Sequence, residues 1–192
     1  MHDLLSIGHS TLEYSTFARR LKSEGVTAIA DVRSTPYSRH QPHFSQSNLS
    51  NALSGDGIAY VFLGTELGGR PAARQLYTDG IADYEKMAQT ETFLSGISRL
   101  LRGAERFRIA MMCSEGHPLD CHRCLLVGRH LKRLRIDTRH LLPSGNSIRQ
   151  SDVESKLLAI SGLSEVDMFS SENERIKIAY RKQSRKAAFS EN

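Results

Sequence analysis

The sequence has few cysteines, no long apolar run and no internal repeat, and these shortages exclude several classes of protein. Three cysteines among 192 residues are too few, and odd in number, for a disulfide-rich secreted scaffold. No run approaches the roughly 18 apolar residues of a membrane helix, and the first residues are not a basic stretch followed by an apolar one. We therefore expect a cytoplasmic protein with reduced thiols and no membrane partner.

The length is that of one ordinary domain with a carboxyl-terminal extension. We expect an α/β domain over residues 1–145 and a helical extension, packed on the same domain, over residues 146–192. The net charge of +5 lies in the tail, and the first 174 residues are formally neutral. Besides Glu191, the charged tail residues are Arg175, Lys177, Arg181, Lys182, Arg185 and Lys186.

This basic tail, together with a second basic stretch at residues 129–135, has two interpretations. Its cations would contact the phosphates of a nucleic acid, with Tyr180 and Phe189 available for stacking. Alternatively, its apolar positions dock on the domain and leave the lysines and arginines in solvent. The sequence leaves both open.

Short apolar segments alternate with stretches of helical periodicity along most of the chain. This alternation predicts an α/β fold, a single domain with a mostly parallel sheet flanked by helices, followed by the basic helical extension. Strands are expected at residues 4–7, 26–30, 58–63, 107–112 and 138–142. Helices are expected from Tyr14 to Gly25, around Leu49, from Met87 to Leu101, after His122, and at residues 151–163 and 176–189, with a Gly-rich connection at 64–80.

Ligands gather beyond the carboxyl ends of the strands in such sheets. The residues at expected strand ends are His9, Asp31, Arg33, Gly64 and Cys113, so one cleft would collect them. Ser10 adds a hydroxyl group beside His9. A lone histidine is more often structural, which is the alternative for this pair.

Residues 113–123 are the densest polar segment, and they hold Cys113 and Cys121 just before Cys124. A loop that leaves a strand and enters a helix directs backbone N–H groups outward and favours anions. Arg123 would clamp such an anion by two hydrogen bonds, and Cys121 would have a depressed pKa. The alternative is a small buried cysteine before a helix that Asp120 caps.

Two further chemistries were weighed for this segment. A phosphatase or rhodanese cradle needs an arginine six positions after the cysteine, but Leu119 stands there, so a cysteine nucleophile would act without such a cradle. Thiolate and imidazole ligands for a metal are available, yet no second Cys-x-x-Cys occurs. We therefore assign no metal ligand and leave the cofactor unknown. The available groups are Cys113, His117, Cys121, His122 and Cys124.

The second polar concentration spans residues 31–43. Asp31 would orient or deprotonate a substrate group, and Arg33 and Arg39 would bind an anion. Ser34 lies between them. An internal pair of Asp31 with an arginine is the alternative, because the two arrangements look alike in sequence. Arg70, after two glycines, is a further candidate for anion binding.

The ordered set of these motifs closely resembles the bacterial family called domain of unknown function 488. The resemblance covers most of the chain and implies a compact α/β domain with no established reaction. The motifs are Ile7-Gly-His-Ser10, Asp31-Val-Arg-Ser-Thr-Pro-Tyr-Ser-Arg39, Glu66-Leu-Gly-Gly-Arg70, Cys113-Ser-Glu-Gly-His-Pro-Leu-Asp-Cys-His-Arg123 and Ala179-Tyr-Arg-Lys-Gln183.

Our leading hypothesis is a strand-end cleft that binds an anionic ligand, such as a nucleotide, a nucleic-acid end or a phosphorylated metabolite, in a hydrolase or transferase. The alternatives are a noncatalytic nucleic-acid-binding module and a metal-dependent enzyme built on the Cys/His cluster. The candidate catalytic residues are His9, Asp31, Cys113, Glu115 and His122. The candidate ligand-binding residues are Ser10, Arg33, Ser34, Arg39, Arg70, Cys121 and Arg123.

Overall fold

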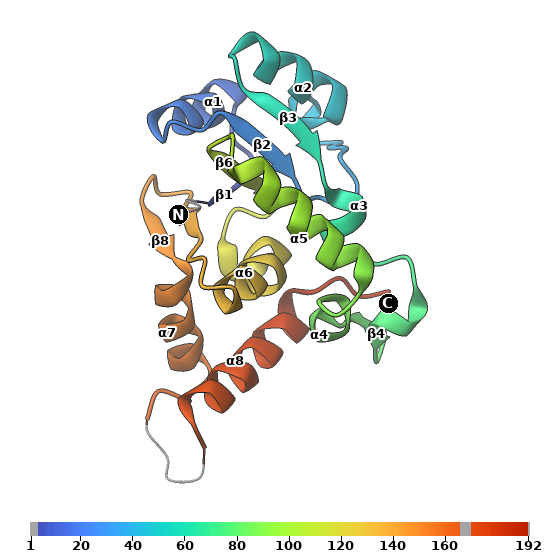
Figure 1. Cartoon of the computed structure of the whole chain (residues 1–192), viewed down its shortest axis with the longest axis vertical. Coiled ribbons are helices and arrows are strands. Elements are labelled where there is room, and N and C mark those ends of the chain that lie inside the picture. The colour runs from blue at the N-terminus through green and yellow to red at the C-terminus, as the bar shows by residue number, and fades with distance from the viewer. Residues whose placement is uncertain (1–3, 166–169, 192) are drawn as a thin grey trace.

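The computed structural model describes residues 4–165 and 170–191, and it has a six-stranded sheet at its centre (Figure 1). The strands are β1 (Leu5–Gly8), β2 (Ala28–Asp31), β3 (Ala59–Phe62), β6 (Ile109–Cys113), β7 (Arg139–Leu141) and β8 (Ser147–Arg149). Their order is β3-β2-β6-β1-β7-β8, and only β8 is antiparallel to its neighbour. The predicted α/β class and mostly parallel sheet are confirmed. A separate hairpin contains β4 (Tyr77–Thr78) and β5 (Ile81–Ala82).

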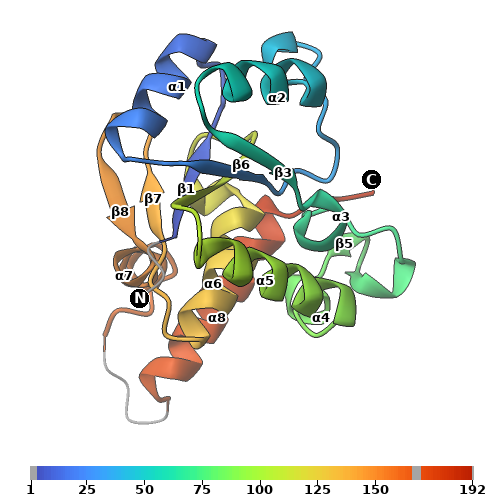
Figure 2. The same ribbon diagram turned by 45° about the horizontal axis from the view of Figure 1, so that its top comes forward.

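Helices cover both faces of the sheet. In Figure 2, α1 and α2 lie on one face, and α5, α6 and α8 lie on the other. The helices are α1 (Tyr14–Ser23), α2 (Gln46–Gly55), α3 (Gly64–Leu67), α4 (Tyr84–Met87), α5 (Glu91–Ala104), α6 (Arg129–Arg133), α7 (Gln150–Ile160) and α8 (Glu172–Ala187). A π-helical stretch, η4 (Arg123–Gly128), leads into α6, and 3-10 turns occur at η1 (Pro42–Phe44), η2 (Arg74–Leu76) and η3 (Pro118–Asp120). Within the described residues, no helix has both the length and the apolar composition to cross a bilayer.

Alternate residues of the central strands pack into two separate hydrophobic cores, one on each face of the sheet. Ile29 and Met112 belong to the core beneath α1 and α2, whereas Ala30, Met111 and Cys113 belong to the core beneath α5 and α6. Both faces of these strands are buried because helices cover both, as expected for a parallel sheet. Cys113 therefore leaves the sheet on the side of η4 and α8.

The direction of the connections reverses at the centre of the sheet. Strands β1 and β6 are neighbours, with Gly8 opposite Cys113. The chain leaves β1 toward α1 on one face and leaves β6 toward α6 on the other (Figure 2). Adjacent strands whose connections diverge in this way open a crevice at their carboxyl ends. The polar strand ends lie at this crevice.

The segment after Cys121 differs from the amphipathic helix expected there. Every residue from Cys121 to Arg129 is buried. The reason is that α8 packs across its outer side, with the Arg129 guanidinium 4.5 Å from the centre of the Tyr180 ring. The structure gives this helix start no side-chain cap, so Asp120 does not cap it.

Four other elements differ from the sequence prediction. The expected helix through Met87 is divided into α4 and α5, because the Thr90 side chain accepts a hydrogen bond from the Phe93 N–H and starts a new helix there. The connection at 64–80 contains α3 and β4. Strand β8 was not predicted, and it extends the central sheet into the region assigned to the extension. Helix α8 starts at Glu172, earlier than expected, with Ser171 and Glu174 forming a capping box.

A chain of buried hydrogen bonds joins the sheet to α7 and α8. The Gln150 amide oxygen only accepts, so His140 Nε2 donates to it at 2.6 Å, and His140 Nδ1 accepts from the Ser6 hydroxyl at 2.6 Å. The Gln150 amide nitrogen then donates to the Tyr180 hydroxyl at 2.7 Å. His140 is neutral in this arrangement, because burial, and after it the charge of Arg123, lowers its pKa from 6.5 to about 4.

We expect the free energy of unfolding to fall as the pH drops from 6.5 toward 4. In this window His140 binds a proton in the unfolded chain but stays neutral in the folded protein. This difference lowers the free energy of unfolding by roughly 2 kcal/mol at about pH 5. Urea unfolding at pH 7.5 and 5.0 measures the effect. The variant His140→Asn should be less stable at neutral pH but less sensitive to acid, whereas exposed His40→Asn should follow the wild type. Equal acid sensitivity in all three proteins would contradict this account.

Candidate functional site

A cavity of about 310 Å³ opens at the carboxyl ends of β2 and β6. Seven of the twelve candidate residues line it: Arg33, Ser34, Arg70, Cys113, Glu115, Cys121 and His122. Most of the other lining residues were not predicted to have a role, and these are Thr35, Tyr37, Gly69, Tyr84, Ser114, Asp120, Ala187 and Phe189. The last two come from the carboxyl-terminal end of the chain, and no local sequence signal connects them with the strand ends.

Two thiols, an imidazole and a carboxylate meet at the base of the cavity. One ligand atom from each of Cys113, Glu115, Cys121 and His122 lies within 4.8 Å of the other three. Both sulfur atoms are 3.8 Å from His122 Nδ1. Glu115 Oε2 lies 2.8 Å from the Cys113 sulfur and 3.0 Å from the Cys121 sulfur. The cysteines and the histidine are buried, and Glu115 is exposed.

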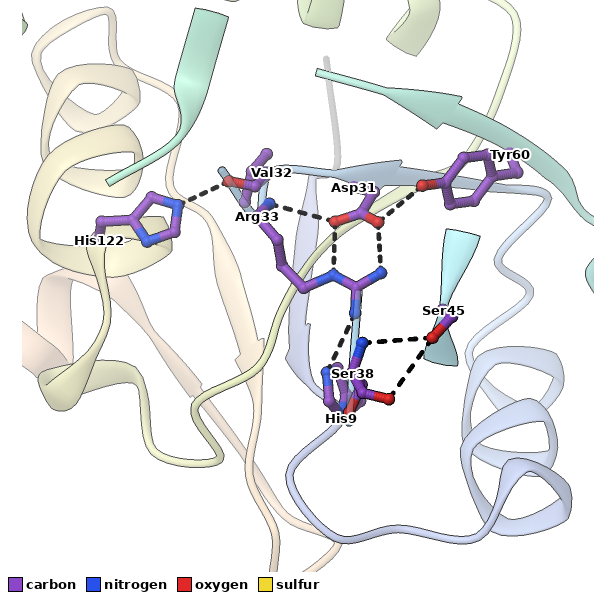
Figure 3. A network of polar contacts seen from close by, with 8 residues as sticks. All are labelled: His9, Asp31, Val32, Arg33, Ser38, Ser45, Tyr60 and His122. Carbon is purple, nitrogen blue, oxygen red and sulfur yellow. Dashed lines mark hydrogen bonds and ion pairs between the residues drawn. The ribbon is translucent and has the colours of Figure 1, made fainter. Parts of the chain in front are cut away.

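The position of the His122 ring is set by one hydrogen bond and one packing contact. Its Nε2 donates to the backbone carbonyl of Val32 at 2.8 Å (Figure 3). This bond leaves Nδ1 facing the two sulfur atoms. Gly69 packs against the same ring, and a Cβ atom at that position would lie 2.8 Å from His122 Cγ. The glycine pair before Arg70 thus has a structural reason, since only a residue without a side chain admits the ring in this position.

The surroundings shift the pKa values of the two thiols in opposite directions. Burial favours the protonated form of both, and it raises the pKa of Cys113 well above its usual range. At Cys121 the effect of burial is outweighed by the hydrogen bond from the Cys113 thiol and by two nearby cations, so its pKa lies well below the usual range. The cations are Arg123 and His122. The atoms packed around the Glu115 carboxylate partly desolvate it, and this effect and the charge of Cys121 raise its pKa.

Arg123 does not line the cavity, contrary to the predicted anion clamp. Its side chain is fully buried, and its two terminal nitrogens donate to the carbonyls of Glu115 and Gly116 at 2.6 and 2.8 Å. The Glu115 carbonyl also lies above β1, where a Cβ atom on Gly8 would be 1.8 Å away. Arg123 therefore holds the loop that carries Glu115 and provides buried positive charge near Cys121.

A second buried network lies next to the cavity. Arg33 donates from Nε and Nη2 to the two oxygens of Asp31, at 2.9 and 2.6 Å (Figure 3). The Tyr60 hydroxyl donates to the same carboxylate at 2.7 Å. This is the internal pair that the sequence left as an alternative. The carboxylate thus holds the guanidinium at the cavity wall, and Tyr60, which the sequence did not indicate, completes the pair.

The histidine after β1 supports this pair from the opposite side. His9 stacks on Phe44 with ring centres 4.2 Å apart, and its Nδ1 donates to the carbonyl of Ser10. Burial lowers the pKa of His9 from 6.5 to about 4, so its Nε2 is free to accept from Arg33 Nη1 at 3.4 Å. His9 therefore contacts Arg33 rather than the cavity.

Two other candidates also lie outside the cavity. Ser10 has a left-handed backbone, with φ of 47°, and its N–H donates to the carbonyl of Ser114. Arg39 is exposed on the loop before η1. By contrast, the Ser34 hydroxyl accepts from the Arg70 N–H at 2.9 Å and joins two segments of the cavity wall.

A family model described as domain of unknown function DUF488 matches residues 13–129, which is more than half of the chain. The chain belongs to this family. No curated protein and no solved structure matches it. The match contains the four clustered residues and the Arg33 pair, whereas α7 and α8 follow it in sequence. The DUF488 region thus supplies the polar groups, and the end of the chain supplies the wall formed by Ala187 and Phe189.

Replacing Arg123 should destabilise the DUF488 protein. In Arg123→Met two buried carbonyls lose their donors, at roughly 1–3 kcal/mol each, so we expect a loss of about 2–4 kcal/mol in the free energy of unfolding. Chemical denaturation measures it. The exposed helical control Arg102→Met should change stability by no more than about 0.5 kcal/mol. A loss no larger than that of the control would show that the loop does not depend on Arg123.

Proposed function

We propose that the protein is a metal-dependent hydrolase or transferase that acts on an anionic substrate. In this proposal Cys113, Cys121 and His122 bind a zinc ion, and Glu115 transfers protons beside it. The observation that carries the proposal is the meeting of these four groups within 4.8 Å of one another at the base of a cavity. The proposal unites two of the hypotheses drawn from the sequence, the anionic ligand and the Cys/His metal site.

The distances suit tetrahedral zinc. Zinc lies about 2.3 Å from a thiolate and about 2.0–2.1 Å from an imidazole nitrogen, so these ligands are separated by about 3.6 Å around a tetrahedral ion. Each sulfur is 3.8 Å from His122 Nδ1. The hydrogen bond from Nε2 to the Val32 carbonyl is also typical of a zinc-bound histidine, because it fixes the tautomer and the ring orientation.

Three protein ligands leave a fourth position for water or substrate, as in catalytic rather than structural zinc sites. Bound zinc would lower the pKa of a water molecule there. Glu115, exposed and within 3.0 Å of both sulfur atoms, is suited to accept the proton of that water and pass it to a leaving group. Arg70 lines the same cavity and favours an anionic substrate.

Protein purified without chelators should contain about one zinc ion per chain. Elemental analysis of Cys113→Ala, Cys121→Ala and His122→Asn should show most of the zinc lost, because each removes a ligand. Cys124→Ala is the matched control: Cys124 is buried but lies outside the cluster, so its zinc content should equal that of the wild type.

Metal-free wild type that cannot be loaded with zinc would overturn the metal assignment. If the Cys121 thiol of that protein were also alkylated rapidly at neutral pH, the site would be a thiol nucleophile instead. Equal zinc content in all four variants would mean that the metal binds elsewhere.

Anion binding can be tested with inorganic phosphate as the probe. Isothermal titration should show affinity at least about tenfold weaker for Arg70→Ala than for the wild type, since a hydrogen bond to a charged group contributes roughly 1.5–3 kcal/mol. Arg74→Ala removes an exposed arginine that does not line the cavity, so it should bind as the wild type does. The same dissociation constant in all three proteins would contradict an anion site at Arg70.

A further inference from the structure

The two basic stretches of the sequence come together in the fold. Helix α8 carries Lys177, Arg181 and Arg185 at intervals of four residues, so a cation recurs along one side about every 6 Å. Helix α6 lies beside it and adds Arg129 and Arg133 (Figure 1). We call these five residues the basic row.

A cavity of about 310 Å³ lies between α4, α6 and the first half of α8. Four members of the basic row line it, together with His130 and a single carboxylate, Glu85. That carboxylate is shared, because it accepts from Arg129 at 3.2 Å and from Arg181 at 2.7 Å. The cavity lining therefore has an excess of positive charge.

Two cations of the basic row, the exposed Arg133 and Lys177, form no ion pair with any residue that the structure describes. Burial, and after it the charge of Arg133, lowers the pKa of both Arg129 and His130. Positive charges that repel one another in a concave surface would be stabilised by an anion.

Along α8, the basic row runs toward the end of the chain that borders the cavity of Cys113, Cys121 and His122. A second hollow, of about 250 Å³, is lined by Arg129, Arg181 and Arg185 together with the carboxylates of Asp83 and Glu85. The strand-end cavity follows, with Ala187 and Phe189 in its wall. Tyr84 lines all three spaces, so each of them borders the same side chain. The exposed pairs of Arg181 with Glu85 and of Arg185 with Asp79 contribute little and can exchange for phosphate.

Aromatic rings stand at the cavity at the end of this path. Tyr37 lines it and is 66% exposed, which is unusual for a large ring. The Arg70 guanidinium lies 4.7 Å from the centre of the Phe189 ring at the same cavity. Flat rings and guanidinium groups beside a row of cations suit a ligand with both bases and phosphates.

We propose that the basic row binds the phosphate backbone of a single-stranded nucleic acid and delivers one nucleotide to the strand-end cavity. Repeated cations match repeated negative charges better than a single phosphate group, and hollows of about 250–310 Å³ suit one strand better than a duplex. This inference rests on the proposed function only in making that nucleic acid the anionic substrate.

The test measures binding of a fluorescein-labelled twelve-nucleotide oligo-dT by anisotropy across a range of salt concentrations. The double variant Arg133→Ala/Lys177→Ala should bind at least about tenfold more weakly at low salt, and the slope of log K against log salt should fall by about 1.4, at about 0.7 per lost phosphate contact. Arg19→Ala/Arg102→Ala removes the same charge from exposed helical positions outside the basic row, and it should match the wild type.

Equal weakening in the two double variants would overturn the basic row, because the effect would then come from net charge alone. Tighter binding of a duplex of the same length would overturn the single strand. Displacement of the oligonucleotide by polyglutamate at equal charge would point to an acidic peptide instead. Zinc content and oligonucleotide affinity are both measured on the wild type, so the two proposals can fail separately. Wild type that contains zinc but does not bind the oligonucleotide would overturn the basic row and leave the metal site. Wild type that binds the oligonucleotide but holds no zinc would overturn the metal site and leave the basic row.

Discussion

The site depends on one buried interaction, the hold of the Arg123 guanidinium on the carbonyls of Glu115 and Gly116. The loop after β6 would otherwise need water or a ligand to satisfy these groups. With the loop held, Glu115 lies over both thiols, and its carbonyl fits into the space that Gly8 leaves above β1. The same guanidinium supplies positive charge that favours the thiolate of Cys121. Loop geometry and site electrostatics therefore have a common origin.

The periodicity of the sequence predicted the sheet, because buried parallel strands are short apolar runs and their carboxyl ends meet at one edge. Cys113 and Arg33 could be placed at that edge for this reason. The role of Arg123 could not be predicted, since a side chain that points at its own loop and one that points at a ligand have the same spacing. Strand β8 was missed because Ser147–Arg149 has one buried residue and no apolar run.

The different positions of Cys113, Cys121 and Cys124 relative to the cavity could be seen only in the structure. All three are close in sequence and fully or almost fully buried, so composition does not separate them. The backbone does, because the extended Cys121 precedes the helix while Cys124 is already within η4. Cys124 consequently faces the Gln150 network, and burial raises its pKa to about 12. A Cys-x-x-Cys pair here has one member in the site and one in the core.

The end of α8 separates part of the cavity wall from the rest of the site along the sequence. The matched family region ends at residue 129, yet the last turn of α8 and the residues after it form part of the cavity wall. The cluster of thiols, imidazole and carboxylate and one part of the cavity wall are thus encoded in separate parts of the chain. A change in the tail can alter the shape of the cavity without disturbing the clustered groups, so the two can vary independently in this architecture.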